Sequence, residues 1–241
     1  TYLPDEKKTT VMDGHGGYMN GSRYYGEDLP INTWYMKRFA GLSEDGLSLW
    51  YYTDKETNEE KTTTTYSTGD FYLCGDPNPD LYGGFGTSIT FHGFDLSTQF
   101  SYLVGGLTYD YGYAGMMGNP TATSVGNRWH KDVLKAWSPE NPSSTIPRWY
   151  FNDLNTTGSS DRFLIDGSYL NLQNIQVGYT LPDSWTSHLK IKNLRLYFVC
   201  DNVYYWSKRK GLDPRRSISG VGTSGKIAPF RTYSGGISLQ F

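Results

Sequence analysis

The sequence predicts an all-β fold, an antiparallel transmembrane β-barrel with long extracellular loops and one short helix. Apolar and polar residues alternate along several segments, as in strands with one face toward lipid and the other toward a lumen. The connections between these segments are alternately short and long. Tyrosine, tryptophan and glycine number 21, 7 and 28 of 241 residues, a composition that fits a barrel and equally fits a secreted β-protein.

The overall charge argues against a protein that binds nucleic acid, and the hydropathy excludes a helical membrane protein. The chain has 24 acidic and 22 basic residues and a net charge of -2, so we expect no broad attraction to nucleic acid or to anionic lipid. Mean hydropathy is -0.57, and no apolar run approaches the roughly 18 residues that a membrane helix needs. Barrel strands remain compatible with these values because only every second residue faces lipid.

The clearest predicted element is a hairpin. Residues Phe85, Ile89 and Phe91 share odd positions, and small or polar residues separate them. After His92-Gly93 the parity changes, and the apolar residues occupy even positions from Phe94 to Val104. This change predicts two strands joined by a tight turn.

Three further strands are predicted toward the end of the chain. In Tyr169–Leu181 the apolar positions change parity, which predicts a β-bulge near Gln173-Asn174. Alternation also marks Ile191–Val203 and Tyr233–Phe241, and weaker strands are predicted at Trp34–Ala40 and Leu47–Thr53.

The lengths of the connections predict an orientation. Outer-membrane barrels have short periplasmic turns and long extracellular loops. Short links are expected at 41–46, 92–93 and 182–189, and long ones at 54–82, 105–168 and 204–230. One long loop is predicted to contain a helix at Asn127–Trp137, where apolar residues share one face.

Several runs of the sequence match segments of one known family of proteins. The run SDRFLIDGSYLNLQNIQVGYTLP at 160–182 resembles a strand block near the end of the barrel of SusC/RagA-type TonB-dependent transporters. It is followed, as in the family, by KIKNLRLY, WSK and KGLDP at 210–214. Residues 75–106 resemble another barrel block, and 40–46 and 135–149 match more weakly.

The resemblance implies a multi-pass barrel of 22 strands in the outer membrane of a Gram-negative, Bacteroidetes-like cell. It further implies a plug domain, energy from TonB-ExbB-ExbD, a SusD-like surface lipoprotein, and a glycan or peptide nutrient. We therefore expect residues 1–241 to be the C-terminal part of the barrel domain, without the plug. Outer-membrane lipid is an expected partner, nucleic acid is not, and neither enzymatic activity nor a cofactor is expected.

Two sets of site residues follow. The family's barrels end in an aromatic residue that the assembly machinery recognises, which implies an assembly signal at Tyr233, Gly235, Ile237, Leu239 and Phe241. Loop aromatics could contact substrate or a partner through their broad apolar faces, although packing within the loops is the more common role of such residues. These are Trp129, Trp137, Trp149, Tyr150, Tyr205 and Trp206.

No metal or catalytic motif is complete. The spacing of Asp76, Asn78 and Asp80 imitates a calcium loop, but Leu81 replaces the required glycine and Thr87 the bidentate glutamate. The four histidines lack metal-ligand spacing, and the two cysteines are interpreted as unpaired small apolar residues. The main alternative class is a secreted β-sandwich carbohydrate-binding module, which would bury both inner sheet faces in a core.

Overall fold

The computed structural model describes residues 10–121, 126, 128–153, 158–186, 191–216, 219–221 and 229–241. The chain divides into two compact units. Unit 1 comprises Thr1–Asn78, Gly106–Asp166 and Arg216–Gly225, and unit 2 comprises Pro79–Gly105, Gly167–Arg215 and Lys226–Phe241. No helix in the described ranges is long and apolar enough to cross a membrane.

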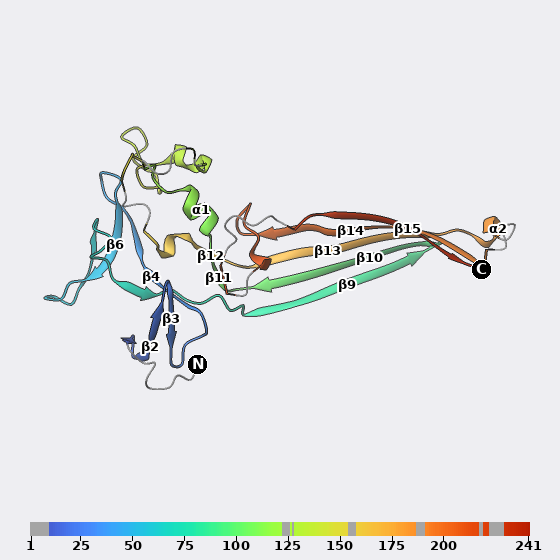
Figure 1. The fold of residues 1–241 in the computed structure, drawn as a ribbon, viewed down its shortest axis with the longest axis horizontal. Coiled ribbons are helices and arrows are strands. Elements are labelled where there is room, and N and C mark those ends of the chain that lie inside the picture. The colour runs from blue at the N-terminus through green and yellow to red at the C-terminus, as the bar shows by residue number, and fades with distance from the viewer. Residues whose placement is uncertain are drawn as a thin grey trace. The chain divides into compact units, whose positions relative to one another are not determined.

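Unit 2 is one antiparallel sheet of five long strands, in the order β15-β14-β13-β10-β9. Figure 1 shows these strands side by side. Strands adjacent in the chain are also adjacent in the sheet, so the topology is a meander. The strands are β9 (Leu81–Phe91), β10 (Phe94–Val104), β13 (Tyr169–Thr180), β14 (Asn193–Ser207) and β15 (Thr232–Gln240), accompanied by a short α2 (Asp183–Thr186) and a 3-10 turn at Pro214–Arg216.

The turn and the bulge predicted from parity are both confirmed. His92 and Gly93 have φ values of 47° and 85°, the positive angles that a two-residue hairpin turn requires. The pairing of β13 with β10 and β14 shifts at Gln173. The extra residue returns the apolar residues on either side of it to the same face.

Unit 1 is built from short strands around a small core. Its sheets follow the orders β1-β2-β3-β4-β8, β5-β6-β7 and β11-β12. The strands are β1 (Thr10–Met12), β2 (His15–Asn20), β3 (Arg23–Gly26), β4 (Thr33–Lys37), β5 (Phe39–Leu42), β6 (Ser48–Thr53), β7 (Glu60–Thr63), β8 (Phe71–Leu73), β11 (Leu107–Tyr109) and β12 (Leu164–Asp166). The core contains Trp34, Met36, Tyr109, Met117 and Phe163.

Two cations are held inside unit 1 by aromatic rings and carbonyl groups. The Arg23 guanidinium lies 3.1 Å from the Trp34 ring centroid and donates to the carbonyls of Asn32 and Ser219. Lys37 is 4% exposed, and its ammonium donates to the carbonyl oxygens of Tyr66, Ser67 and Gly69. These bonds replace the water that each charge loses on burial.

Two expectations about unit 1 are corrected. The strands expected at 34–40 and 47–53 exist, but β4 pairs with β3 and β8, and β6 pairs with β5 and β7, so neither joins the long sheet. The helix expected at Asn127–Trp137 is only a 3-10 turn at Lys131–Lys135, and Asn127 lies outside the described residues. Leu134, on the expected apolar face, is 88% exposed, so little burial stabilises a longer helix.

In the described part of this long connection the α-helix is instead α1 (Tyr111–Met116), which was not predicted. The Asp110 side chain caps α1 by accepting from the Tyr113 amide at 2.9 Å. Met117, which follows α1, belongs to the core of unit 1.

Candidate functional site

The strand register places nearly all large apolar side chains of unit 2 on one face of its sheet. Across the strands, Phe91 pairs with Phe94, Phe94 with Tyr179, and Tyr179 with Leu196. Leu196 in turn pairs with Ile237. Directly paired residues project to the same face, so these five residues form one row that crosses all five strands. The row contains no charged residue.

The apolar face is largely exposed. Its members include Phe85 at 56%, Ile89 at 58%, Phe91 at 69%, Phe198 at 51% and Ile237 at 65% exposed. Exposed apolar patches on monomeric soluble proteins rarely extend beyond a few hundred Å². The core of a β-sandwich, the main alternative class, would instead bury these side chains.

The opposite face is mainly polar, although Leu103, Val199 and several tyrosines also lie on it. Ser88, Thr90, Ser97 and Gln99 lie on it together with Arg195. The Arg195 guanidinium binds Asp95 through two bonds, Nε to Oδ1 at 2.9 Å and Nη2 to Oδ2 at 2.5 Å. A side chain at Gly178 would clash with both residues, so glycine gives this ion pair room to bridge β10 and β14 across β13.

Aromatic residues mark both ends of the apolar face. Tyr204 and Trp206 lie at one end of β14, and Phe94 and Tyr179 lie at the other end of the sheet. Leu194 and Trp206 are 12 residues apart, which corresponds to roughly 40 Å of strand and to about 30 Å of height at a tilt of about 40°. An apolar band of that height between aromatic girdles is typical of transmembrane barrels.

The connections of unit 2 are sorted by length. The turn His92-Gly93 and the link between β13 and β14, which contains α2, are at one end of the sheet. The links 105–168 and 208–231 leave from the other end, where Leu81 pairs with Val104 and Tyr169 with Ser207. The short link expected at 41–46 is instead part of the β5–β6 hairpin of unit 1.

Strand β15 presents the residues of the predicted assembly signal on the apolar face. Tyr233 pairs with Cys200, Ile237 with Leu196, and Leu239 with Leu194. Gly235 pairs with Phe198 and leaves space beside that ring. Phe241 follows the strand and is 74% exposed.

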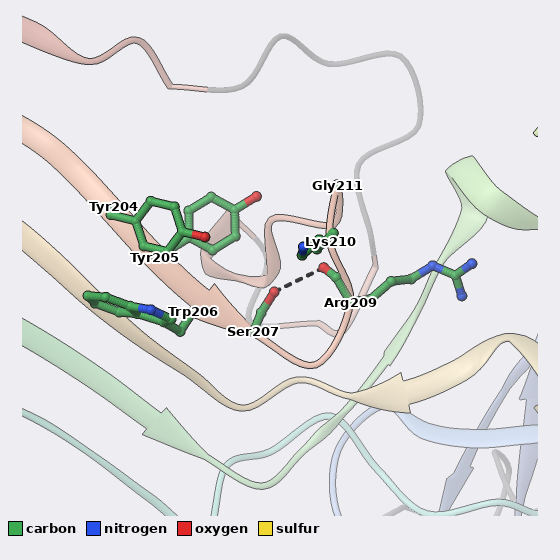
Figure 2. A pocket seen from close by; sticks show the side chains of 7 residues that line it. All are labelled: Tyr204, Tyr205, Trp206, Ser207, Arg209, Lys210 and Gly211. Carbon is green, nitrogen blue, oxygen red and sulfur yellow. Dashed lines mark hydrogen bonds between the residues drawn. The ribbon is translucent and has the colours of Figure 1, made fainter.

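A pocket of about 400 Å³ lies where β14 ends. Figure 2 shows its lining: Tyr204, Tyr205, Trp206, Ser207, Arg209, Lys210 and Gly211. The Tyr204 and Trp206 rings pack edge to face, with centroids 4.9 Å apart, and each residue is about half exposed. Ser207 Oγ donates to the carbonyl of Arg209 at 3.1 Å, which holds the basic residues close to the strand end.

Arg215 ties the segment after β14 to the polar face of the sheet. Its guanidinium binds Asp213 at 2.8 and 2.7 Å and donates to the Asn171 and Asn202 side-chain oxygens at 2.6 and 2.8 Å. The guanidinium also lies 4.4 Å from the Tyr205 ring centroid. The Asp213 hydrogen bonds raise the pKa of Arg215, so the arginine stays charged at any physiological pH.

The structure divides the predicted loop aromatics between packing and exposed positions. Trp129 and Trp149 both donate to the Gly118 carbonyl, at 3.1 and 3.0 Å, and pack edge to face. Trp137 packs against Gly46. Tyr150 and Trp206 are half exposed, whereas Tyr205 lies under the Arg215 guanidinium.

The predicted site residues did not include Tyr204, the Lys208–Lys210 run or Arg215. The first two had a visible signal, since a run of three basic residues directly follows an aromatic stretch. Arg215 had none, because its amide partners come from two different strands.

The Asp76 segment is a turn. Asp76 Oδ1 accepts from the backbone and side-chain amides of Asn78, at 2.9 and 2.6 Å, as in an Asx turn. Among the described residues, no group of three or more His, Cys, Asp or Glu side chains could hold a metal ion.

The fold is that of one wall of an antiparallel transmembrane β-barrel. Comparison with known proteins confirms the resemblance to SusC/RagA-type TonB-dependent receptors. TonB-dependent receptor P3 of Formosa agariphila is 29% identical over 235 residues, which are 93% of this chain and 22% of that protein. TonB-dependent receptor SusC of Bacteroides thetaiotaomicron is 27% identical over 180 residues, 73% of this chain and 17% of SusC.

Among solved structures, a chain of the RagAB peptide transporter is similar, with a TM-score of 0.76 and 25% sequence identity. The match covers 92% of this chain and 24% of that one. This chain therefore spans about a fifth of the curated relatives and about a quarter of the structural one. No protein-family model matches the chain.

Proposed function

We propose that the chain is the C-terminal part of the barrel domain of an outer-membrane, TonB-dependent importer of large nutrients, and that it is not an enzyme. The observation that carries this proposal is the exposed apolar face of the five-stranded sheet, opposite a polar face. In a membrane the apolar face contacts lipid acyl chains, and the polar face lines the lumen of the barrel.

Among the residues that the structure describes, no strand pairs with the outer edges of β9 and β15. In a bilayer an unpaired strand edge is too costly to persist, because its peptide groups find no water. Bacterial outer-membrane barrels have at least about 8 strands, so further strands of the same protein are proposed to complete the wall.

The nutrient and the partners are part of the same proposal. SusC and RagAB relatives support import with a SusD-like surface lipoprotein and TonB-ExbB-ExbD. RagAB is a peptide transporter, and the proposed substrate class for this chain is an oligopeptide or a glycan. Unit 1, which contains most of the long connections, is proposed to be extracellular and to contact nutrient or partner through exposed aromatics such as Tyr150.

A deletion and fractionation experiment tests the proposal. The full-length protein should fractionate with the outer membrane, require detergent for extraction, and copurify with a lipoprotein. Its deletion should abolish growth on an oligopeptide or a glycan as sole carbon source, and a TonB deletion should have the same effect. A protein that is soluble and monomeric without detergent would support the carbohydrate-binding module instead.

The residues Tyr233, Gly235, Ile237, Leu239 and Phe241 are proposed to act as the barrel-assembly signal, provided that they end the full-length protein. Deleting Phe241, or replacing it with aspartate, should then lower the amount of protein in the outer membrane without lowering its synthesis. Deletion of Phe151, which is 62% exposed in unit 1, is the control. Equal abundance of the Phe241 variants and the parent protein would count against the signal.

A further inference from the structure

Arg162 is a partly buried cation of unit 1, in the 3-10 turn Asp161–Phe163 that directly precedes β12. Its guanidinium carbon lies 5.3 Å from the Phe39 ring centroid and 5.1 Å from the Phe163 ring centroid. Phe163 belongs to the core of unit 1, whereas Phe39 is partly exposed. The charge of Arg162 is therefore in contact with two aromatic rings at the border between the core and solvent.

Other cations of unit 1 that contact aromatic rings also have polar partners. Arg23 and Lys37 each donate to backbone carbonyls. Arg38 contacts two tyrosine rings and pairs with Glu60 at 3.1 Å. Within the described part of the chain, the Arg162 guanidinium has neither a hydrogen-bond acceptor nor a carboxylate partner. Its N–H donors are thus left for water or for a ligand.

The carboxylate next to Arg162 in the sequence does not neutralise it. Asp161 Oδ1 instead accepts from the backbone amide of Phe39 at 2.8 Å. Burial raises the pKa of Asp161, and the cation that opposes this shift is Arg38 rather than Arg162. The local fold therefore directs this acid away from the guanidinium.

The guanidinium is already partly dehydrated before any ligand binds. Burial lowers the pKa of Arg162 to about 10, which leaves the side chain charged at neutral pH. The two ring faces attract this charge, but they replace few of the hydrogen bonds that it made to water. An anion with two oxygens would supply those bonds, and such charge-assisted bonds are stronger than neutral ones.

We propose that Arg162 binds the C-terminal carboxylate of an oligopeptide. Two N–H groups of a guanidinium match the two oxygens of a carboxylate, and the last side chain of the peptide packs against the exposed part of Phe39. A uronic acid fits less well, because its ring hydroxyls need hydrogen-bond partners and phenylalanine rings offer none. The site rests on the proposed function, which places unit 1 outside the cell.

Peptide binding to the full-length protein in detergent solution tests the site. The probe is N-acetyl-leucyl-phenylalanine as the free acid, with its C-terminal amide as the uncharged comparison, and titration calorimetry measures both affinities. Loss of a hydrogen-bonded charged partner corresponds to roughly 10- to 100-fold in affinity. The parent protein should therefore bind the amide about 10- to 100-fold more weakly than the acid, and Arg162→Gln should bind the acid as weakly as the amide.

Matched variants control for charge and for geometry. Arg38→Gln removes the same charge from beside two rings and should leave the affinity for the acid unchanged, because Arg38 already pairs with Glu60. Arg162→Lys keeps the charge but cannot form the two parallel bonds, so it should prefer the acid by a smaller factor than the parent protein does. Neither trigalacturonate nor inorganic phosphate, at the concentration of the peptide, should displace it.

Each outcome decides for or against the site. Equal affinity for the acid and the amide, or no binding of either, overturns it, and this comparison needs no variant. An Arg162→Gln protein that is folded, as a heat-modified band on an electrophoresis gel reports, and that binds the acid as tightly as the parent protein also overturns it. Displacement by trigalacturonate would assign the site to an acidic glycan, displacement by phosphate would assign it to a small anion, and either result overturns the peptide.

The same measurements separate this site from the barrel function. A folded outer-membrane protein that imports nutrient but does not distinguish the acid from the amide overturns the carboxylate site alone. A protein that needs no detergent overturns the barrel function itself.

Discussion

A charge placed on the apolar face of β14 should destabilise the protein far more than the same charge on the adjacent residue. Phe198 lies on the apolar face and is 51% exposed, whereas Val199 projects to the polar face, opposite Gln176. Each residue of a tilted strand advances roughly 2.5 Å along the membrane normal. Phe198 is four residues from Leu194 and eight from Trp206, so it lies about 5 Å from the middle of the apolar band.

That depth sets the expected magnitude. Arginine on the lipid face of a barrel costs about 2–4 kcal/mol at the midplane and about 0–1 kcal/mol near the interface. We expect Phe198→Arg to lower the free energy of unfolding by about 3 kcal/mol, and Trp206→Arg by at most about 1 kcal/mol. Val199→Arg should change it by less than about 1 kcal/mol, since the new charge enters the lumen.

Urea titration of the full-length protein in lipid vesicles measures these differences, and the heat-modified band on a gel reports the folded fraction. If Val199→Arg is as harmful as Phe198→Arg, the apolar face does not contact lipid. If Trp206→Arg costs as much as Phe198→Arg, the aromatic residues are not at the interface.

Three other predictions use unit 1, the segment after β14 and the connections. Arg215→Ala should open the segment 208–216 to protease and cost about 3–5 kcal/mol, because removing one partner of a buried ion pair is strongly destabilising; the double variant Arg215→Ala/Asp213→Ala should recover part of the loss, and the absence of any recovery would contradict this reasoning. Burial raises the pKa of Cys74 to about 11, so at pH 8 its thiol should react with iodoacetamide about 100-fold more slowly than a free thiol with a pKa of about 8.5; mass spectrometry of the alkylated peptide gives the rate, which should rise about ten-fold per pH unit up to about pH 11, and a fast reaction at pH 8 would show that the thiol is accessible and ionised. In an otherwise cysteine-free protein on intact cells, Thr62→Cys should react with a membrane-impermeant thiol reagent and Ser184→Cys should not, and the reverse pattern would invert the proposed orientation.

The sequence by itself determined the hairpin turn and the β-bulge of the long sheet, because each depends only on residues close to it in the chain. The change of parity at His92-Gly93 predicts a hairpin because a two-residue turn pairs an odd-numbered residue with an even-numbered one, as Phe91 pairs with Phe94. Such a turn needs positive φ angles, and both residues have them. The parity shift within Tyr169–Leu181 predicts the bulge found at Gln173, since one extra residue is the simplest way to keep the apolar side chains on one face. The apolar face of the long sheet could therefore be assigned before the strand pairing was known.

Only the tertiary structure decided which strands pair and which polar groups meet. Alternation predicts strands at 34–40 and 47–53, but it does not specify their partners, and all five residues of β4 are buried within unit 1. From the sequence, Trp129 and Trp149 are candidates for contact with substrate or a partner. No local pattern in the sequence reveals that both donate to the Gly118 carbonyl. Arg215 meets Asn171 and Asn202 because the chain after β14 folds back over the sheet, which brings together residues up to 44 positions apart. Such contacts depend on the complete fold, whereas alternation depends only on the geometry of one strand.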